Sequence, residues 1–170
     1  MSEAAILDPC CGGRMMWFDR QDQRALFGDI RSEAHILCDG RAFNITPDLK
    51  MDFREMPFPD ESFRLVAFDP PHLRHAGQNS WLRAKYGILG DDWQEDLRRG
   101  FSECFRVLKP EGILIFKWNA IQIRTPQILA LTPHRPLFGH PSGKRADTHW
   151  MTFMKPAAQQ SGQGAGTPRC

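Results

Sequence analysis

The stretch FRLVAFDPPH (63–72) decides how this chain is expected to fold. It begins as a nearly continuous apolar run and ends in an acid, two prolines and a histidine. An apolar run without alternation is typical of a strand buried on both faces of a parallel sheet. Pro70 and Pro71 cannot donate backbone hydrogen bonds, so strand pairing has to end there. The stretch therefore predicts a strand over 64–68 that runs into a rigid corner.

Apolar runs of the same kind recur along the chain, and turn residues separate them. Glycine or proline lies beside several of these runs, and the first leads into a glycine-rich turn. The runs predict further strands at 4–7, 25–27, 49–53, 112–118 and 150–154, with a weaker candidate at 128–131.

One long helix is predicted between Asp92 and Leu108. Leu97, Phe101 and Phe105 repeat every four residues and form one apolar stripe, and a proline shortly after forbids continuation. A second, short helix is expected over 14–19. Strands that alternate with helices predict an α/β fold: a mostly parallel, doubly wound, Rossmann-like sheet with helices on both faces.

Length and composition favour one compact domain. The chain has 170 residues, 41% of them hydrophobic, and a net charge of only +2. We expect a single domain over 1–156 and a disordered tail over 157–170, because the tail has almost nothing apolar to bury. The five cysteines show no spacing typical of a metal site, and we expect no metal. No signal peptide or membrane-spanning run is apparent, which predicts a cytoplasmic protein without membrane contact.

Acids follow the predicted strands with unusual regularity. Asp8, Asp29, Asp52 and Asp69 each stand at or just after the end of a strand candidate, and Lys117 ends another. In doubly wound sheets, ligands bind beyond the carboxyl ends of the strands. The sequence therefore predicts a binding site at that edge of the sheet.

Two motifs in this order carry a family resemblance: ILDPCCGG (6–13) and DPPH (69–72). Together they resemble the class I S-adenosylmethionine-dependent methyltransferases that methylate exocyclic amines of adenine or cytosine in nucleic acid. The chain looks like a compact, phage-like form of this DPPY-type amino-methyltransferase group. It departs from the pattern at Arg14, where glycine is usual, and at His72, where a larger aromatic ring is usual.

The resemblance implies S-adenosyl-L-methionine as cofactor and assigns roles to the strand-end acids. Asp8 would pair with the amine of the cofactor, and Asp52 would bind the adenine while Phe53 packs beside its ring. Asp29 lies 21 positions after Asp8, close to the roughly 20-residue offset at which an acid meets ribose. Glycine permits close approach of the backbone to a ligand. The turn residues assigned to the cofactor are Pro9, Cys10, Gly12 and Gly13.

The corner itself would perform the chemistry. An exocyclic amine is a poor nucleophile because its lone pair is delocalised into the ring, and two acceptors on its N–H bonds draw that lone pair out. Asp69 supplies a carboxylate and Pro70 a carbonyl, while Pro71 fixes the exit of the chain. His72 would stack on the flipped base. We hypothesise that protonation of His72 weakens this grip between pH 8 and 6.

Two basic loops are predicted to bind substrate. Segment 73–92 interleaves basic and aromatic residues, a pattern that suits nucleotides. Segment 134–150 has a basic tip, and Lys117 would line the pocket from the side. The substrate-binding residues expected from these segments are Arg74, Trp81, Lys85, Tyr86, Lys144 and Arg145. We expect nucleic acid as partner, DNA rather than RNA, with little sequence specificity because no length remains for a recognition region.

Alternatives remain open at this point. The acceptor is RNA adenine or cytosine N4 in a second interpretation. In a third, the chain is a methyltransferase-like binding subunit without activity, and in a fourth it methylates a small molecule or a protein amide. The oligomeric state is not indicated by the sequence.

Overall fold

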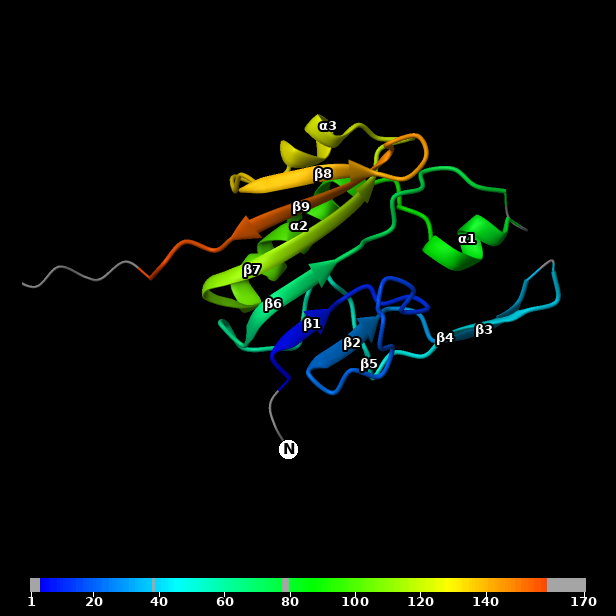
Figure 1. The fold of residues 1–170 in the computed structure, drawn as a ribbon, viewed down its shortest axis with the longest axis horizontal. Helices are drawn as coiled ribbons and strands as arrows, with labels where there is room; N and C mark the ends of the chain where they lie inside the picture. The colour runs from blue at the N-terminus through cyan, green and yellow to red at the C-terminus, as the bar shows by residue number, and fades with distance from the viewer. Residues whose placement is uncertain (1–3, 38, 78–79, 159–170) are drawn as a thin grey trace, which may run out of the picture.

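The computed structural model describes residues 4–37, 39–77 and 80–158, so most of the predicted tail lies outside the described residues. Its centre is a seven-stranded sheet in the order β5-β2-β1-β6-β7-β9-β8 (Figure 1). The first five strands in this order are parallel, β9 is antiparallel to β7, and β8 is antiparallel to β9. The bounds are β1 Ile6–Asp8, β2 Ala25–Asp29, β5 Leu49–Lys50, β6 Phe63–Phe68, β7 Leu108–Asn119, β8 Phe138–Ser142 and β9 Thr148–Met154.

The predicted α/β class is confirmed. The sheet is mostly parallel, and six of the predicted strands coincide with observed ones, although the run at 49–53 forms a strand only over Leu49–Lys50. The weaker strand candidate at 128–131 is wrong: its first two residues end helix α3 (Thr125–Leu129). The side chain of Ile128 is fully buried in the main core, so its apolarity marks a helix packed on the sheet.

The main core lies between the sheet and helix α2 (Trp93–Val107), close to the predicted helix. Alternate residues of β7 point toward the helix, and the rings of Phe101 and Phe116 are 4.8 Å apart. Gly100 lets the helix approach closely, because an added Cβ would come within 2.7 Å of Phe53 and 2.9 Å of Phe68. Tight packing of this kind holds β6 and β7, and hence the residues at their ends, in fixed positions.

The opposite face is covered differently from what we expected. The helix predicted over 14–19 is absent, and this segment consists of turns and bends. Asp19 and Asp22 each accept a hydrogen bond from a backbone N–H two residues on, which favours turns over a helix. Trp17 packs on Phe27 of β2 at 4.8 Å between ring centroids. The segment therefore covers this face near β1 and β2, while α2 and α3 share the other face.

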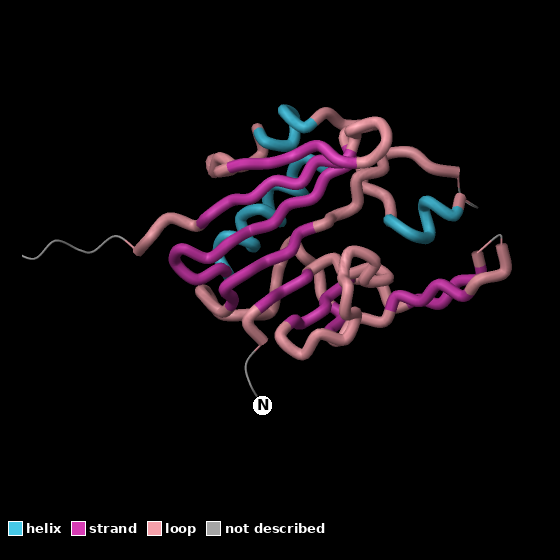
Figure 2. The backbone as a smooth tube through the Cα atoms, viewed as in Figure 1, coloured by secondary structure: helices cyan, strands magenta, loops and turns pink. Residues whose placement is uncertain are grey.

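Two small elements project from the body on the side where β1, β2 and β6 end (Figure 2). They are the hairpin of β3 (Glu33–Ile36) with β4 (Ala42–Ile45) and helix α1 (Trp81–Tyr86), and no strand or helix was predicted at these places. Helix α1 buries none of its residues. In the described parts of the chain, no helix is long and apolar enough to cross a membrane.

Candidate active site

A cleft opens beyond the carboxyl ends of the neighbouring strands β1, β2 and β6, where the sequence predicted a site. Most of the predicted site residues meet here, although they come from segments far apart in the chain. Those that line the cleft are Asp8, Pro9, Cys10, Gly12, Gly13, Asp29, Phe53, Asp69, Pro70, Pro71, His72, Lys85, Tyr86 and Lys117.

The glycine turn after β1 is tied to the end of β2. The backbone N–H of Cys11 donates to the carbonyl of Gly28 at 2.9 Å, and that of Gly12 donates to Asp29 Oδ2 at 2.9 Å. Gly12 has φ +49° and Arg14 φ +53°, both in the left-handed region that favours glycine. The turn after β1 thus has a left-handed backbone at position 14, although the residue there is arginine rather than glycine.

The side chain of Arg14 offsets the cost of its backbone conformation. Its guanidinium forms a 2.6 Å ion pair with Asp48 and lies 3.9 Å from the centroid of the Phe27 ring. Further hydrogen bonds go to the carbonyls of Arg20 and Thr46. Arg14 therefore points away from the cleft. It binds the segment 14–19 to β2 and to the loop that precedes β5.

Asp29 lies at the mouth of the cleft, 4% exposed, with both oxygens engaged. Besides Gly12, it accepts a hydrogen bond from the backbone N–H of Arg31 at 2.9 Å and a longer one from Arg31 Nε at 3.4 Å. Arg31 Nη1 also donates to the carbonyl of Ala84 at 3.0 Å. Arg31 thus links the end of β2 to helix α1 across the cleft.

Asp8 is the most buried acid of the cleft, 1% exposed. It accepts hydrogen bonds from Trp17 Nε1 at 2.7 Å and from the backbone N–H of Cys10 at 3.2 Å. Burial raises the pKa of Asp8 to about 7, and the nearby charges of Asp69 and Asp29 add to that rise. A cation in the cleft would therefore be matched with a carboxyl group that ionises near neutral pH.

Asp69 and Lys117 form an ion pair at the ends of neighbouring strands. Phe68 of β6 and Phe116 of β7 are register partners, so the next residue of each strand lies side by side. Lys117 Nζ donates to Asp69 Oδ2 at 2.5 Å. Burial raises the pKa of Asp69, and the charge and hydrogen bond of Lys117 oppose that rise.

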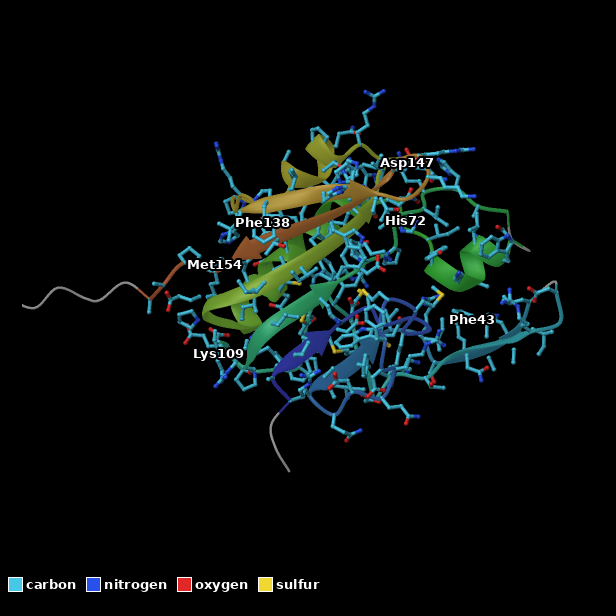
Figure 3. The ribbon with its side chains drawn as sticks, in the orientation of Figure 1. Phe43, His72, Lys109, Phe138, Asp147 and Met154 are labelled. Atoms are coloured by element: carbon cyan, nitrogen blue, oxygen red, sulfur yellow. The ribbon has the colours of Figure 1, made fainter. Side chains whose placement is uncertain are left out.

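His72 lies just beyond β6, close to helix α1 (Figure 3). Its ring centroid is 5.1 Å from that of Tyr86 and 6.3 Å from that of Trp118. Burial, and then the charge of Lys117, lower the pKa of His72 to about 4. The ring is therefore neutral from pH 6 to 8, which contradicts the hypothesis that its protonation weakens substrate binding in that range.

A second cavity, of about 350 Å³, lies on the other side of the acid–proline corner, which we define as Asp69–His72. The residues that line both cavities are Asp69, His72, Tyr86 and Lys117. Neutral side chains complete the second cavity: Leu73, Leu82, Asn119, Ile121, Gln122 and Thr148. Gln122 Oε1 accepts hydrogen bonds from the backbone N–H groups of Arg74 and His75 at 2.6 and 3.1 Å, which fixes the chain that leaves the corner.

Asp52 was expected at the cofactor but lines neither cavity. Its carboxylate forms a 2.6 Å ion pair with Arg54, which also pairs with Asp96 of α2 at 2.8 Å. The hydrogen bond from Arg54 holds the pKa of Asp52 below its usual range. Asp52 thus joins the loop after β5 to the helix, and Phe53 beside it reaches the cleft instead.

Four expected substrate residues also lie outside the two cavities. Trp81, 46% exposed, lines a groove between α1 and the β3–β4 hairpin. The guanidinium of Arg74 lies 5.9 Å from the ring centroid of Trp93. Lys144 and Arg145 are exposed in the turn between β8 and β9, a few residues before Thr148 at the second cavity.

Several lining residues were not predicted. Arg31 had a usable signal, because it follows a strand-end acid by two residues. The others carry no pattern of their own that assigns them to a site. They are Cys11, Met15, Met16 and Ile30 in the cleft and Leu73, Leu82, Ile121, Gln122 and Thr148 in the second cavity.

The cleft does not resemble a metal or thiol site. Within the described residues, no group of three or more histidine, cysteine or acidic side chains is arranged to hold a metal ion. Burial raises the pKa of Cys10 well above its usual range and that of Cys11 to about 12. Both thiols are therefore protonated at neutral pH and are poor nucleophiles.

No protein-family model matches the chain, and no curated protein matches it. Solved structures do match its fold. The PH0226 protein of Pyrococcus horikoshii OT3 superposes with a TM-score of 0.57 at 15% identity, over 88% of this chain and 81% of that one. A TehB-like SAM-dependent methyltransferase from Corynebacterium glutamicum gives 0.52 at 15% identity, over 90% and 80%.

A third structure is the 1,6-didemethyltoxoflavin-N1-methyltransferase of Burkholderia thailandensis, solved with 1,6-didemethyltoxoflavin and S-adenosylhomocysteine. It gives a TM-score of 0.50 at 14% identity, over 89% of this chain and 70% of that one. At these identities the likeness concerns the fold, which is the class I methyltransferase fold.

Proposed function

We propose that this chain transfers a methyl group from S-adenosylmethionine to an exocyclic amine of a nucleobase, foremost adenine N6 in DNA. The observation that supports this most strongly is that Asp69 and His72 of the acid–proline corner line two cavities at once. Methyl transfer between two molecules needs a donor site and an acceptor site that meet at one point. The corner is that point.

The cleft is suited to the cofactor by its charge. The cofactor carries a positive sulfur, an amine and a carboxylate, and the cleft presents both acids (Asp8, Asp29 and Asp69) and cations (Arg31, Lys85 and Lys117). Asp29 would accept the ribose hydroxyls, and the turn at Gly12 and Gly13 would hold the methionine part. When bound, S-adenosylmethionine supplies an electrophilic methyl group on a positively charged sulfur.

The corner would orient and activate the acceptor. The Asp69 carboxylate and the Pro70 carbonyl accept hydrogen bonds from the two N–H bonds of the amine, which turns its lone pair toward the donor site. Lys117 engages Oδ2 of Asp69, so Oδ1 would receive the amine. The neutral ring of His72 would stack on the base, with Tyr86 beside it.

The surface around α1 supports a nucleic-acid substrate. Lys85 Nζ lies 5.3 Å from the ring centroid of Trp81, and Arg83 lines the groove beside that ring. The opposite wall of the groove comes from β3 and includes His35 and the acid Glu33, whose Oε2 lies 2.8 Å from His35 Nε2. An exposed aromatic ring flanked by basic groups suits a single strand or the nucleotides beside a flipped base.

Transfer to separate acceptor pools tests the proposal. The chain is incubated with S-adenosylmethionine that carries a deuterated methyl group and with single-stranded DNA, double-stranded DNA, RNA or protein. The products are digested and analysed by mass spectrometry. We expect labelled N6-methyladenine from DNA, and about 10²- to 10³-fold less in the same time with the Asp69→Ala variant.

The matched control is Asp91→Ala, which removes an exposed acid in the loop before α2 and should keep full activity. Label in RNA adenine or in cytosine N4 would correct the acceptor and keep the chemistry. Label only in protein, or in no pool, would refute the proposal.

A further inference from the structure

We infer that Lys117 is a positioning residue that keeps the Asp69 carboxylate ionised and fixed in orientation, ready to accept the target amine. The inference rests on the proposed function of Asp69 and extends it to a second residue. In this role Lys117 touches neither the methyl donor nor the leaving sulfur and acts through the acid alone.

The geometry holds Lys117 from both sides. It extends from the end of β7 toward β6, where its Nζ lies 2.5 Å from Asp69 Oδ2. Toward β9, its register partner is Trp150, whose ring centroid lies 5.6 Å from Nζ. The side chains of Lys117 and Asp69 are only 23% and 21% exposed, so solvent screens the pair weakly.

The surroundings of Asp69 make this cation necessary. Asp8 on β1 and Asp29 on β2 line the same cleft, and the charge of Asp69 helps to raise the pKa of Asp8. Arg31 and Lys85 also line the cleft, but neither is hydrogen-bonded to Asp69. His72 on the corner itself is neutral, because burial lowers its pKa. Among the described residues, Lys117 is the cation that pairs with Asp69.

Loss of that cation has a chemical consequence. Burial already raises the pKa of Asp69, and Lys117 opposes the rise. Without Lys117 the acid would hold a proton at higher pH. A protonated carboxyl group donates through one oxygen and no longer accepts from the amine with a full charge.

Two substitutions separate this role from a merely structural one. Lys117→Met removes the charge and keeps the length of the side chain, and Lys117→Arg keeps the charge. The titration midpoint of Asp69 is followed by carbon-13 NMR of aspartate carboxyl groups, with the Asp69 signal assigned from the Asp69→Asn spectrum. The acid limb of the pH profile of kcat/KM is measured in parallel.

We expect the Asp69 midpoint and the acid limb of Lys117→Met to move up together by about 1 to 3 pH units, the usual influence of an adjacent opposite charge. Lys117→Arg should stay close to the wild type. The matched control is Lys109→Met, at the opposite end of the same strand, which should leave both readouts unchanged. Calorimetry should find the affinity for S-adenosylmethionine changed less than about twofold by Lys117→Met, because the donor contacts remain.

An unchanged Asp69 midpoint in Lys117→Met would overturn the inference. If Lys117→Met does not fold, Lys117→Gln is used, and the same rise is required of it. The Asp69 midpoint could also move in Lys117→Met although the wild type transfers no methyl group to any pool. That result would refute the proposed function and would still support the electrostatic role of Lys117. The NMR readout therefore distinguishes the two failures.

Discussion

The two cavities that meet at the acid–proline corner differ in how many charged side chains line them. The cleft on the side of β1 and β2 presents three acids, Asp8, Asp29 and Asp69, and three cations, Arg31, Lys85 and Lys117. In the second cavity, Asp69 is the only acid among the described lining residues, and the others are mostly aromatic, aliphatic or neutral polar, with Lys117 as the cation. Asp69 thus faces one site rich in charged groups and another lined mostly by neutral side chains. The difference teaches that, on the proposed function, the charged cofactor and the neutral base would each meet a matching lining.

The cavities also differ in how the chain builds them. The cleft is made mainly from residues that directly follow β1, β2 and β6, so strand order brings them together. The second cavity takes Gln122 from the loop after β7, Thr148 from the start of β9 and Leu82 from α1. Its shape therefore depends on how three segments that are distant in the sequence pack together. Substitutions in the cleft should therefore change the affinity for the donor, and substitutions at the second cavity should change the affinity for the acceptor.

The largest expected effect concerns Asp8 in the cleft. Its pKa is about 7 in the folded chain against 3.8 for an ordinary aspartate, so the folded state binds the extra proton between these pH values. Stability contributed by that proton is present at low pH and is lost as the pH rises through 7. The roughly three-unit difference corresponds to about 4 kcal/mol in full, of which about 2.7 kcal/mol belongs to the two units between pH 5 and pH 7.

Asp8→Asn should remove most of this pH dependence while its amide oxygen still accepts from Trp17. Urea unfolding at pH 5 and pH 8 measures it: the wild type should lose stability toward pH 8, and the variant should not. If the free energy of unfolding changed equally between pH 5 and pH 8 in the two proteins, Asp8 would be ionised in the folded chain across this range.

Next in size is Asp69→Ala at the shared corner. Loss of a preorganised group at the reacting atoms should lower kcat by about 10²- to 10³-fold. The affinity for S-adenosylmethionine should change by less than about threefold, because the glycine turn and Asp29 remain. Single-turnover transfer and calorimetry measure the two effects. Parallel loss of both would place Asp69 in donor binding rather than in catalysis.

Asp29→Asn should weaken donor binding and leave the acceptor side intact. The substitution removes the charged acceptor for the ribose, and hydrogen bonds to charged groups contribute about 1.5–3 kcal/mol, or roughly 10- to 150-fold in Kd. Calorimetry with S-adenosylhomocysteine checks the affinity. Saturating donor should restore kcat, and failure to restore it would contradict the division between the cavities.

His72→Phe should have the smallest effect on pH dependence. Because the pKa of His72 is about 4, its charge does not change between pH 6 and 8. The ratio of kcat/KM at pH 8 to that at pH 6 should therefore agree between variant and wild type within about twofold. A drop toward pH 6 seen only in the wild type would show that His72 titrates in this range.

Prediction from the sequence succeeded where short-range signals suffice. The corner at Asp69–His72 and the glycine turn at Gly12 follow from residue types that end strands or permit positive φ. It was wrong over 14–19, because the local hydrogen bonds of Asp19 and Asp22 outweigh the apolar residues there. Asp52 also follows a predicted strand, but Arg54, two residues on, donates a hydrogen bond to its carboxylate, and Asp52 lines neither cavity.

The second cavity was beyond prediction for a different reason. Gln122, in the loop after β7, and Thr148, at the start of β9, are ordinary polar residues, and only tertiary packing brings them to the corner. The hairpin of β3 and β4 was missed because five of its eight strand positions are exposed and few are strongly apolar. Weak periodicity of this kind gives no signal until the rest of the fold is in place.

A crystal structure with S-adenosylhomocysteine and adenosine tests the central claim most directly. We predict the ribose of the cofactor product at Asp29, its sulfur on the cleft side of the corner, and the adenine in the second cavity. The adenine N6 should lie within hydrogen-bond distance of Asp69 and of the Pro70 carbonyl. Adenine bound elsewhere, or sulfur remote from Asp69, would contradict the account.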